Sequence, residues 1–273
     1  GAATSVTVPP EGPSAVMSRI LGGLKSLGIS PSAAPVAPKP DESSPVTTAP
    51  GIPALPGRTV GIDLGTTFSC VAFMDLSGQP VAVSNCDGDR TTPSVVRVED
   101  DRVVTVGKSA LRALDSFSDE IALVVKRDMG YRLFHKPIRG RQFPPEVLSA
   151  LILRKLKLDA EATLGPVVNA VVTVPAYFDE TRRRATMDAA QMAGLHVLEI
   201  LNEPTAAALA FAWRRGHCSF DRSDDRPRVV VVYDLGGGTF DCSVVQYHGT
   251  DFCVLATDGD VQLGGYDWDH RLV

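Results

Sequence analysis

The sequence predicts an α/β protein with a mixed β-sheet, preceded by a disordered tail. Three observations lead to this prediction. From residue 58 onwards, short apolar segments are separated by Gly and Asp, which is typical of strands and turns. In the middle of the chain, strand-like segments alternate with helical patterns, as in βαβ units. Residues 1–57 instead contain eleven of the 20 prolines.

Residues 1–57 form the predicted tail. Pro, Ala, Ser, Thr and Gly dominate them, and this composition buries too little apolar surface to offset the entropy of ordering the chain. Within the tail, Ala15–Leu27 has apolar residues at helical spacing, interrupted by Gly22-Gly23. This segment could be a short docking helix, although a plain tail is the favoured interpretation. Its apolar positions are Val16, Ile20, Leu24 and Leu27.

The chain after the tail begins with predicted hairpins. Ser77-Gly78 and Asp100-Asp101 supply turn residues between apolar segments of strand length. The strands expected in this region are Thr59–Asp63, Ser69–Asp75, Pro80–Asn85, Val95–Glu99 and Val103–Val106.

Helices are expected in the middle of the chain. The first covers Pro144–Leu164, and Asp179 can cap a second that ends near Gly194. Pro204 opens a third helix, which Gly216 terminates. The apolar face of the first helix comprises Val147, Leu148, Leu151, Ile152 and Leu156. The remaining predicted strands are Ala170–Val174, Val197–Leu201, Val229–Asp234, Phe240–Tyr247 and Asp251–Thr257.

The composition excludes several classes of protein. The formal net charge of −5 belongs wholly to residues 58–273, which argues against a nucleic-acid-binding protein with its basic face. No apolar stretch is long enough to span a membrane, and no secretory signal is visible. The five cysteines form no C-x-x-C pair and are interpreted as reduced thiols. We therefore expect a soluble cytoplasmic protein.

Two segments of the chain repeat one pattern. In each, an apolar strand ends in Asp, and then come Leu, a Gly/Thr turn and a second apolar strand that begins with Phe. The aspartates are Asp63 and Asp234, which lie 171 residues apart, as expected of a duplicated lobe rather than a short repeat. The copies read VGIDLGTTFSCV from Val60 and VYDLGGGTFDCSV from Val232.

The composition of the two turns suits a polyphosphate ligand. Glycine lets backbone N–H groups approach an anion closely, and the hydroxyls of Thr66, Thr67 and Thr239 add donors. The aspartate at each strand end supplies a hard oxygen ligand for Mg²⁺, directly or through water. Two such hairpins facing each other would clamp a polyphosphate from both sides. A single copy would be interpreted more simply as an ordinary glycine-rich turn.

Two other phosphate-binding motifs fail. Gly236–Gly238 precede a strand instead of the helix that a dinucleotide-binding fold requires. Gly107-Lys108-Ser109 lacks the P-loop glycine five residues earlier, where Arg102 stands. Neither motif explains the paired hairpins.

Five stretches of the sequence together indicate a protein family. They are GIDLGTTFSCVA (61–72), NAVVTVPAYFDETRRRAT (169–186), LNEPTAAALAF (201–211), YDLGGGTFD (233–241) and GDVQLGGYDWDHRLV (259–273). In combination they resemble the nucleotide-binding domain of the 70-kilodalton heat-shock protein family, in the actin and hexokinase superfamily. The resemblance covers residues 58–273 and implies an α/β, duplicated, actin-like (ribonuclease H-like) ATPase fold. It implies a nearly complete lobe I at 58–227, with a shortened outer subdomain at about 93–147, and the start of a truncated lobe II at 228–273.

The resemblance also implies the roles of site residues. Asp63 and Asp234 match residues that organise Mg²⁺ and K⁺ around the phosphates of ATP or ADP. Lys126 matches the lysine that positions the attacking water. Glu203 matches a carboxylate that acts through the water shell of the metal, and Asp241 matches one near the nucleophile. Phosphate contacts are implied for Gly65, Thr66, Thr67, Phe68, Gly236, Gly237, Gly238 and Thr239, and an interdomain switch for Pro175 and Arg183.

Without the resemblance, several of these residues have simpler interpretations. A single lysine such as Lys126 is usually a surface residue. Glu203 precedes a proline and could simply favour a helix N-terminus electrostatically. Spacing alone does not distinguish Arg183 from its neighbours Arg182 and Arg184.

The chain also departs from the family pattern. The segment 126–144 is shorter than usual, Phe68 stands where Tyr is common, and Tyr266 replaces an acidic residue. The sequence begins at Gly1 and stops at Val273 inside an expected helix, so we expect a fragment that lacks part of the adenosine pocket. We expect weak or absent ATP turnover by this fragment and ATPase activity in its parent.

The resemblance implies a chaperone that couples ATP hydrolysis to binding and release of unfolded or extended polypeptides through a domain outside this chain. A J-domain co-chaperone and a nucleotide-exchange factor are the implied partners, and no nucleic acid or membrane is expected. One alternative is a non-catalytic regulatory relative, against which the retained catalytic side chains argue. Another is a metabolite kinase, but nothing in residues 75–170 suggests a sugar-binding loop.

Overall fold

The computed structural model describes residues 54–100, 103–218 and 226–272. The possible docking segment at 15–27 and nearly all of the predicted tail lie outside these residues. Where the described chain begins, Leu55 exchanges two hydrogen bonds with Asn169. Its N–H donates to Oδ1 of Asn169 at 2.8 Å, and its carbonyl accepts from Nδ2 at 2.7 Å. This buried asparagine therefore holds the chain where it enters the first strand.

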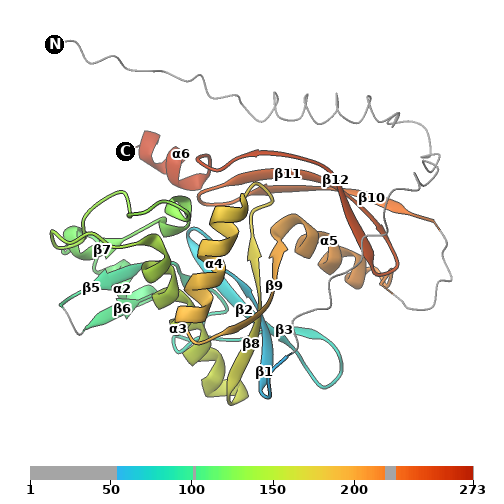
Figure 1. The fold of residues 1–273 in the computed structure, drawn as a ribbon, viewed down its shortest axis with the longest axis horizontal. Coiled ribbons are helices and arrows are strands. Elements are labelled where there is room, and N and C mark those ends of the chain that lie inside the picture. The colour runs from blue at the N-terminus through green and yellow to red at the C-terminus, as the bar shows by residue number, and fades with distance from the viewer. Residues whose placement is uncertain (1–53, 101–102, 219–225, 273) are drawn as a thin grey trace, which may run out of the picture.

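The central sheet contains six strands: β1 (Arg58–Asp63), β2 (Phe68–Met74), β3 (Pro80–Ala82), β4 (Thr92–Pro93), β8 (Val167–Val174) and β9 (His196–Asn202). Their order is β3-β2-β1-β8-β9, with β4 paired to β2 beside this path (Figure 1). β1 is antiparallel to β2 and parallel to β8, which confirms the predicted mixed sheet. The strand expected at Pro80–Asn85 is shorter than predicted and ends at Ala82.

Three longer helices position the site: α3 (Pro145–Leu164), α4 (Glu180–Met192) and α5 (Glu203–Arg214). α3 and α4 pack against each other beside the central sheet (Figure 1). Leu148, Ile152 and Leu156 of α3 are buried, whereas Val147, predicted on the same face, is exposed. The predicted cap of α4 is confirmed, because Asp179 Oδ1 accepts a hydrogen bond from the N–H of Arg182 at 2.9 Å.

A small outer subdomain carries the sheet β6-β5-β7, formed by β5 (Val96–Val98), β6 (Val104–Val106) and β7 (Ile121–Ala122). Val96 lies opposite Val106 in an antiparallel pair, which confirms the predicted hairpin. The segment Gly107-Lys108-Ser109, which lacks the first glycine of a P-loop, lies at the start of a short helix. The helical elements here are α2 (Lys108–Arg112) and two 3-10 turns, η1 (Ser118–Glu120) and η2 (Val125–Asp128).

The last part of the chain is an antiparallel sheet of β10 (Arg228–Leu235), β11 (Phe240–His248) and β12 (Asp251–Asp260), followed by α6 (Gly265–Leu272). Its first two strands and the turn between them repeat the arrangement of β1 and β2, as the sequence repeat predicts. Helix α5 contacts both this sheet and the central sheet, so it lies between the two (Figure 1). The predicted helix at the end of the sequence is confirmed by α6.

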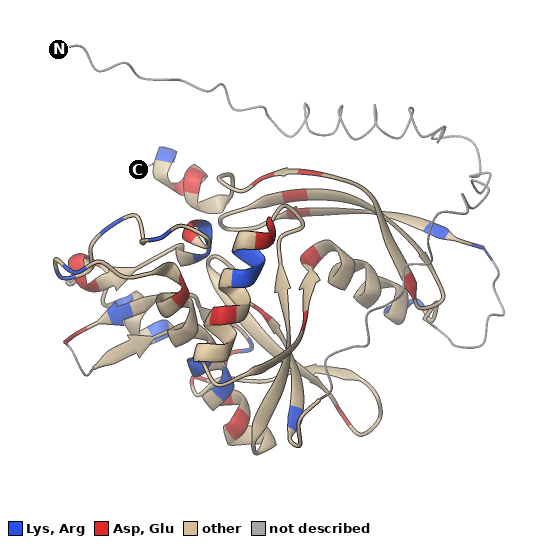
Figure 2. Cartoon of the chain, viewed as in Figure 1, with Lys and Arg blue, Asp and Glu red and all other residues tan. Residues whose placement is uncertain are grey.

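The main hydrophobic core lies between the central sheet, α3 and α4, and a smaller one surrounds Phe240, Cys242 and Val244. All five cysteines are free, as expected of reduced thiols. Figure 2 shows basic and acidic residues mixed along α3 and α4. Among the described residues, no helix is long and apolar enough to cross a membrane.

Candidate functional site

The two Gly/Thr turns meet in the structure. The first joins β1 to β2, and the second, residues 236–239, joins β10 to β11. A Cβ atom built on Gly237 would lie 2.4 Å from Oγ1 of Thr67, and one built on Gly238 would lie 2.2 Å from Cγ2 of Thr66. No side chain fits at these two glycines while the turns stay in place. The turns are therefore in direct contact, and a polyphosphate clamped between them requires them to separate.

All three glycine carbonyls of the second turn accept hydrogen bonds. The donors are the N–H of Gly265, the N–H of Tyr266 and Nε of Arg127, at 3.0, 2.9 and 2.8 Å from the carbonyl oxygens of Gly236, Gly237 and Gly238, respectively. Among the described residues no peptide bond is cis. In each peptide unit the N–H of the next residue therefore points away from the glycine carbonyl. No hydrogen-bond partner is found among the described residues for these N–H groups, of Gly237, Gly238 and Thr239. Gly238 and Thr239 are buried, and a Cβ built on Gly264 would lie 2.4 Å from the Gly238 nitrogen, so these N–H groups become available to an anion only when the turn is uncovered.

Lys126 and Glu203, both predicted from the family resemblance, form a buried ion pair. Lys126 lies in η2 with 5% of its side chain exposed, and its Nζ donates to Oε1 of Glu203 at 2.5 Å. Glu203 is the first residue of α5. Burial raises the pKa of Glu203, and the nearby Lys126 opposes this shift. The simpler interpretation of Lys126 as a surface residue is therefore wrong.

Three aspartates lie near this ion pair. Asp63 ends β1, where its Oδ1 accepts from Oγ1 of Thr173 at 3.0 Å. Asp234 and Asp241 face each other across β10 and β11. Burial and the charge of Asp63 raise the pKa of Asp234. Burial and the charges of Glu203 and Asp234 raise the pKa of Asp241 to about 7.

These carboxylates fit a hydrated divalent cation. The positive charge of Lys126 opposes the rise in pKa of three of them, Glu203, Asp234 and Asp241. Within the described part of the chain, Oδ1 of Asp241 is buried without a hydrogen-bond partner. Among the described residues, no three His, Cys, Asp or Glu side chains are grouped closely enough to enclose a metal. Mg²⁺ in proteins usually keeps several waters and uses one or two carboxylates together with substrate phosphates. The arrangement suits that mode of binding rather than a cage made wholly of protein atoms.

The remaining predicted phosphate contacts lie in or beside the two turns. Thr66 and Thr239 are buried, and Gly65 donates its N–H to Oγ of Ser69 at 3.2 Å. Gly65 allows a close approach, because a Cβ there would lie 2.0 Å from the carbonyl oxygen of Phe68. The side chain of Phe68 is itself exposed.

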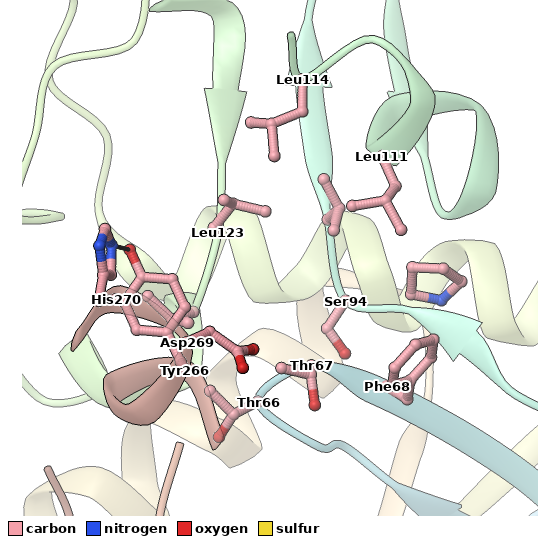
Figure 3. Close-up of a pocket in the computed structure, with 13 residues that line it drawn as sticks. Thr66, Thr67, Phe68, Ser94, Leu111, Leu114, Leu123, Tyr266, Asp269 and His270 are labelled. Atoms are coloured by element: carbon pink, nitrogen blue, oxygen red, sulfur yellow. Dashed lines mark hydrogen bonds between the residues drawn. The ribbon is translucent and has the colours of Figure 1, made fainter. Parts of the chain in front are cut away.

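Beside the first turn lies a cavity of about 400 Å³ (Figure 3). Leu111, Leu114 and Leu123 of the outer subdomain form part of its wall, and α6 adds Tyr266 and His270. Oη of Tyr266 and Nε2 of His270 are 2.8 Å apart. Its wall is mostly apolar, although the hydroxyl-bearing side chains of Thr66, Thr67 and Ser94 also line it.

The predicted switch residues lie at one end of the central sheet. Pro175 follows β8, and its carbonyl accepts from the N–H of Phe178 at 3.1 Å. Arg183 donates to the Phe178 carbonyl and to Oδ1 of Asn202, the residue before Glu203. Tertiary contacts thus distinguish Arg183 from its neighbours, which spacing did not. Tyr177 is exposed, and its hydroxyl donates to Asp258 Oδ1 at 3.0 Å.

Sequence reasoning missed two residues of this site, Arg127 and Asp267. Arg127 follows Lys126 directly, and Asp267 lies in α6. Nη1 of Arg127 donates to Oδ1 of Asp267 at 2.9 Å, and Nη2 donates to Oδ2. The two residues lie 140 positions apart, so no local pattern relates them.

The comparison with protein families agrees with this geometry. The family model described as Hsp70 protein matches residues 59–139 and 133–273. These matches include both turns, the Lys126–Glu203 pair and the aspartates around it. The fold is accordingly the mixed α/β fold of an actin-like ATPase. The chain belongs to the Hsp70 family.

Proposed function

We propose that this chain binds the phosphates of MgATP and MgADP and carries the residues that hydrolyse ATP in a molecular chaperone. Family membership supports a nucleotide-binding chaperone role in general. The observation that carries the specific proposal is the second turn. Its three glycine carbonyls all accept hydrogen bonds, which leaves the N–H groups of Gly237, Gly238 and Thr239 as donors to an anion once the turns separate.

The chemistry of the site suits phosphoryl transfer to water. This reaction is catalysed mostly by positioning and by neutralisation of charge on the transferred group. Backbone N–H groups of the second turn and the hydroxyls of Thr66, Thr67 and Thr239 would donate to phosphate oxygens. Bound Mg²⁺ would neutralise phosphate charge, and Asp63 and Asp234 would hold it, directly or through water. K⁺ as a second cation stays a prediction.

Three side chains would handle the attacking water. Lys126 would place a positive charge near the γ-phosphate and orient the water. Glu203 holds the ammonium group in position, and its own pKa is raised by burial. Asp241 would accept a proton, because a pKa of about 7 suits a base at neutral pH. The family resemblance implies separate roles for Lys126 and Glu203, and in this proposal the two side chains act as a pair.

Coupling to a polypeptide client would run through the far end of the same elements. Arg183 links α4 to Asn202, the residue next to Glu203, and the turn of Pro175 lies beside it. We propose that these contacts relay nucleotide state towards a client-binding domain, with a J-domain co-chaperone and a nucleotide-exchange factor as partners. The cytoplasmic location stays a prediction.

Binding and turnover by residues 1–273 test this function. Calorimetric titration with ADP and ATP should show Mg²⁺-dependent binding that Asp234→Ala abolishes and the exposed control Asp188→Ala retains. ATP turnover by this chain alone should be weak or absent. Absence of Mg²⁺-dependent binding at millimolar nucleotide would contradict the proposed phosphate site. Tight binding with efficient turnover would contradict the expectation of a weak fragment.

A further inference from the structure

Arg127 joins two parts of the molecule that are distant in the sequence. It lies in η2, and among the described residues the acceptors of its side-chain hydrogen bonds, Gly238 and Asp267, both follow β10. Nε donates to the carbonyl of Gly238 at 2.8 Å, while the two Nη atoms form a fork on the carboxylate of Asp267. The side chain of Arg127 is 9% exposed. Bidentate pairs of this kind are stronger and more directional than ordinary hydrogen bonds.

Asp267 is itself held in position by its own chain. Its Oδ2 also accepts the N–H of Gly264 at 2.8 Å, and the adjacent Tyr266 places its ring 5.6 Å from the guanidinium of Arg127. The N–H groups of Gly265 and Tyr266 hold two carbonyls of the second turn. The start of α6 and the second turn therefore form one unit, which Arg127 fastens to the first lobe.

This fastening presses the two turns together. The Cβ distances at Gly237 and Gly238 leave no space between the second turn and the side chains of Thr66 and Thr67. A phosphate group cannot enter between the turns until they separate. Any separation of the second turn from the first lobe must break or lengthen the bonds of Arg127, because these bonds cross the same boundary.

We propose that Arg127 and Asp267 form an interlobe latch that keeps the two turns closed and sets the rate at which phosphate groups enter and leave. Arg127 is a positioning residue in this proposal, since it acts on the turn through the Gly238 carbonyl. The proposal rests on the proposed function only in naming the turns as the phosphate site. The latch itself is a property of the protein without nucleotide.

Hydrogen exchange in the absence of nucleotide tests the latch directly. Arg127→Gln and Asp267→Asn should each speed exchange of the hydrogen-bonded amides of Gly236, Gly264, Gly265 and Tyr266, by about thirtyfold for loss of a buried charged partner. The matched control is Arg97→Gln. Nε of Arg97 donates to Glu120 at 2.8 Å, but both residues belong to the outer subdomain. Unchanged exchange of the turn in correctly folded variants would overturn the proposal.

A conservative variant and a charge reversal distinguish loss of the latch from general loss of structure. Arg127→Lys keeps the charge but loses the fork, so exchange should rise less than in Arg127→Gln. The double variant Arg127→Asp/Asp267→Arg should recover part of the protection that each single reversal loses. Loss of protection throughout the chain, equal in the Arg97→Gln control, would indicate a merely structural role and overturn the latch.

Release of fluorescent MgADP provides the functional measurement. Arg127→Gln should raise both the association and the dissociation rates, whereas Arg97→Gln should leave them unchanged. If the wild-type chain binds no MgADP, the proposed function fails while the exchange experiment still decides the latch. If MgADP binds normally and neither the rates nor the exchange respond to Arg127→Gln, the latch fails and the proposed function stands.

Discussion

Burial gives Lys126 and Glu203 their importance at the scale of single residues. Lys126 has 5% and Glu203 14% of its side chain exposed, so each charge depends on the other for compensation. Removing one partner of a buried ion pair leaves an uncompensated charge. Val124, two positions before Lys126, adopts φ 51°, a left-handed conformation that is unfavourable for a β-branched residue. Local backbone strain thus accompanies the placement of this lysine.

We expect Lys126→Met to lower the free energy of unfolding by about 3 kcal/mol, because it leaves Glu203 buried and unpaired. The double variant Lys126→Met/Glu203→Gln should recover part of this loss. Urea denaturation of the wild type and the three variants, including Glu203→Gln alone, measures the coupling. Strictly additive effects in the double variant would contradict an energetic pairing of the two side chains.

Asp241 should make stability depend on pH. Its pKa in the folded protein is about 7, above the ordinary 3.8, so the folded state binds this proton more tightly than the unfolded state. This contribution to stability is fully present below pH 3.8 and is lost as the pH rises through about 7. Asp241→Asn should therefore stabilise the protein at pH 8 relative to pH 5, by about 2 kcal/mol after allowance for partial hydration.

Urea midpoints of the wild type and Asp241→Asn, measured from pH 5 to 8, provide this comparison. Asp188→Asn, at a position of α4 where 45% of the side chain is exposed, is the matched control for the loss of a carboxylate. A difference between the wild type and Asp241→Asn that stays constant over this pH range would contradict titration of Asp241 within it.

At the scale of elements, the chain contains two strand–turn–strand units, β1–β2 and β10–β11, and contact between their turns decides which glycines tolerate a side chain. In the second turn, Gly238 faces Thr66 closely, whereas a Cβ on Gly236 would meet its nearest atom, the Thr239 carbonyl oxygen, only at 3.4 Å. Neighbouring glycines of one motif thus differ in their structural role.

We expect Gly238→Ala to lower the free energy of unfolding by about 2 kcal/mol, because its methyl group overpacks against the first turn. Gly236→Ala should lower the free energy of unfolding by less than about 1 kcal/mol, because the nearest atom to its methyl group lies 3.4 Å away, at ordinary van der Waals distance. Thermal and urea unfolding of the two variants measures the difference. Equal destabilisation would show that the turns are not in contact in solution.

At the scale of the whole molecule, a few contacts join the central sheet and its helices to the sheet β10-β11-β12 around the site. Besides Arg127 and Asp267, the hydroxyl of Tyr177 reaches Asp258 on β12, and α5 contacts both sheets. A ligand that bridges the lobes should stabilise the whole domain, because it binds the folded state alone.

Removal of the metal tests this coupling. Addition of Mg²⁺ and ADP should raise Tm, with about 1.4 kcal/mol of added stability when ADP is present at ten times its Kd. EDTA should reverse the increase, because the nearby carboxylates repel the phosphates unless a cation lies between them. An increase that persists in EDTA would contradict a metal-dependent site.

Local patterns predicted much of this fold. Apolar spacing predicted the strands of the central sheet except β4, and Asp179, Pro204 and Gly216 marked ends of α4 and α5, since each acts within a few residues of its own position. The errors arose where tertiary packing overrides spacing. Val147 lies on the predicted face of α3 yet is exposed, and β3 ends earlier than its apolar run.

The sequence by itself determined the α/β class, the duplicated turns and, through the family resemblance, the Lys126 and Glu203 that flank them. These features are encoded in short motifs, in which each residue acts on its near neighbours. Only the tertiary structure decided that the two turns touch, that Lys126 is buried against Glu203, and that Arg127 reaches Asp267. The physical reason is that these contacts join residues 77 to about 170 positions apart. Such pairs are brought together by packing of the lobes, which no local spacing describes.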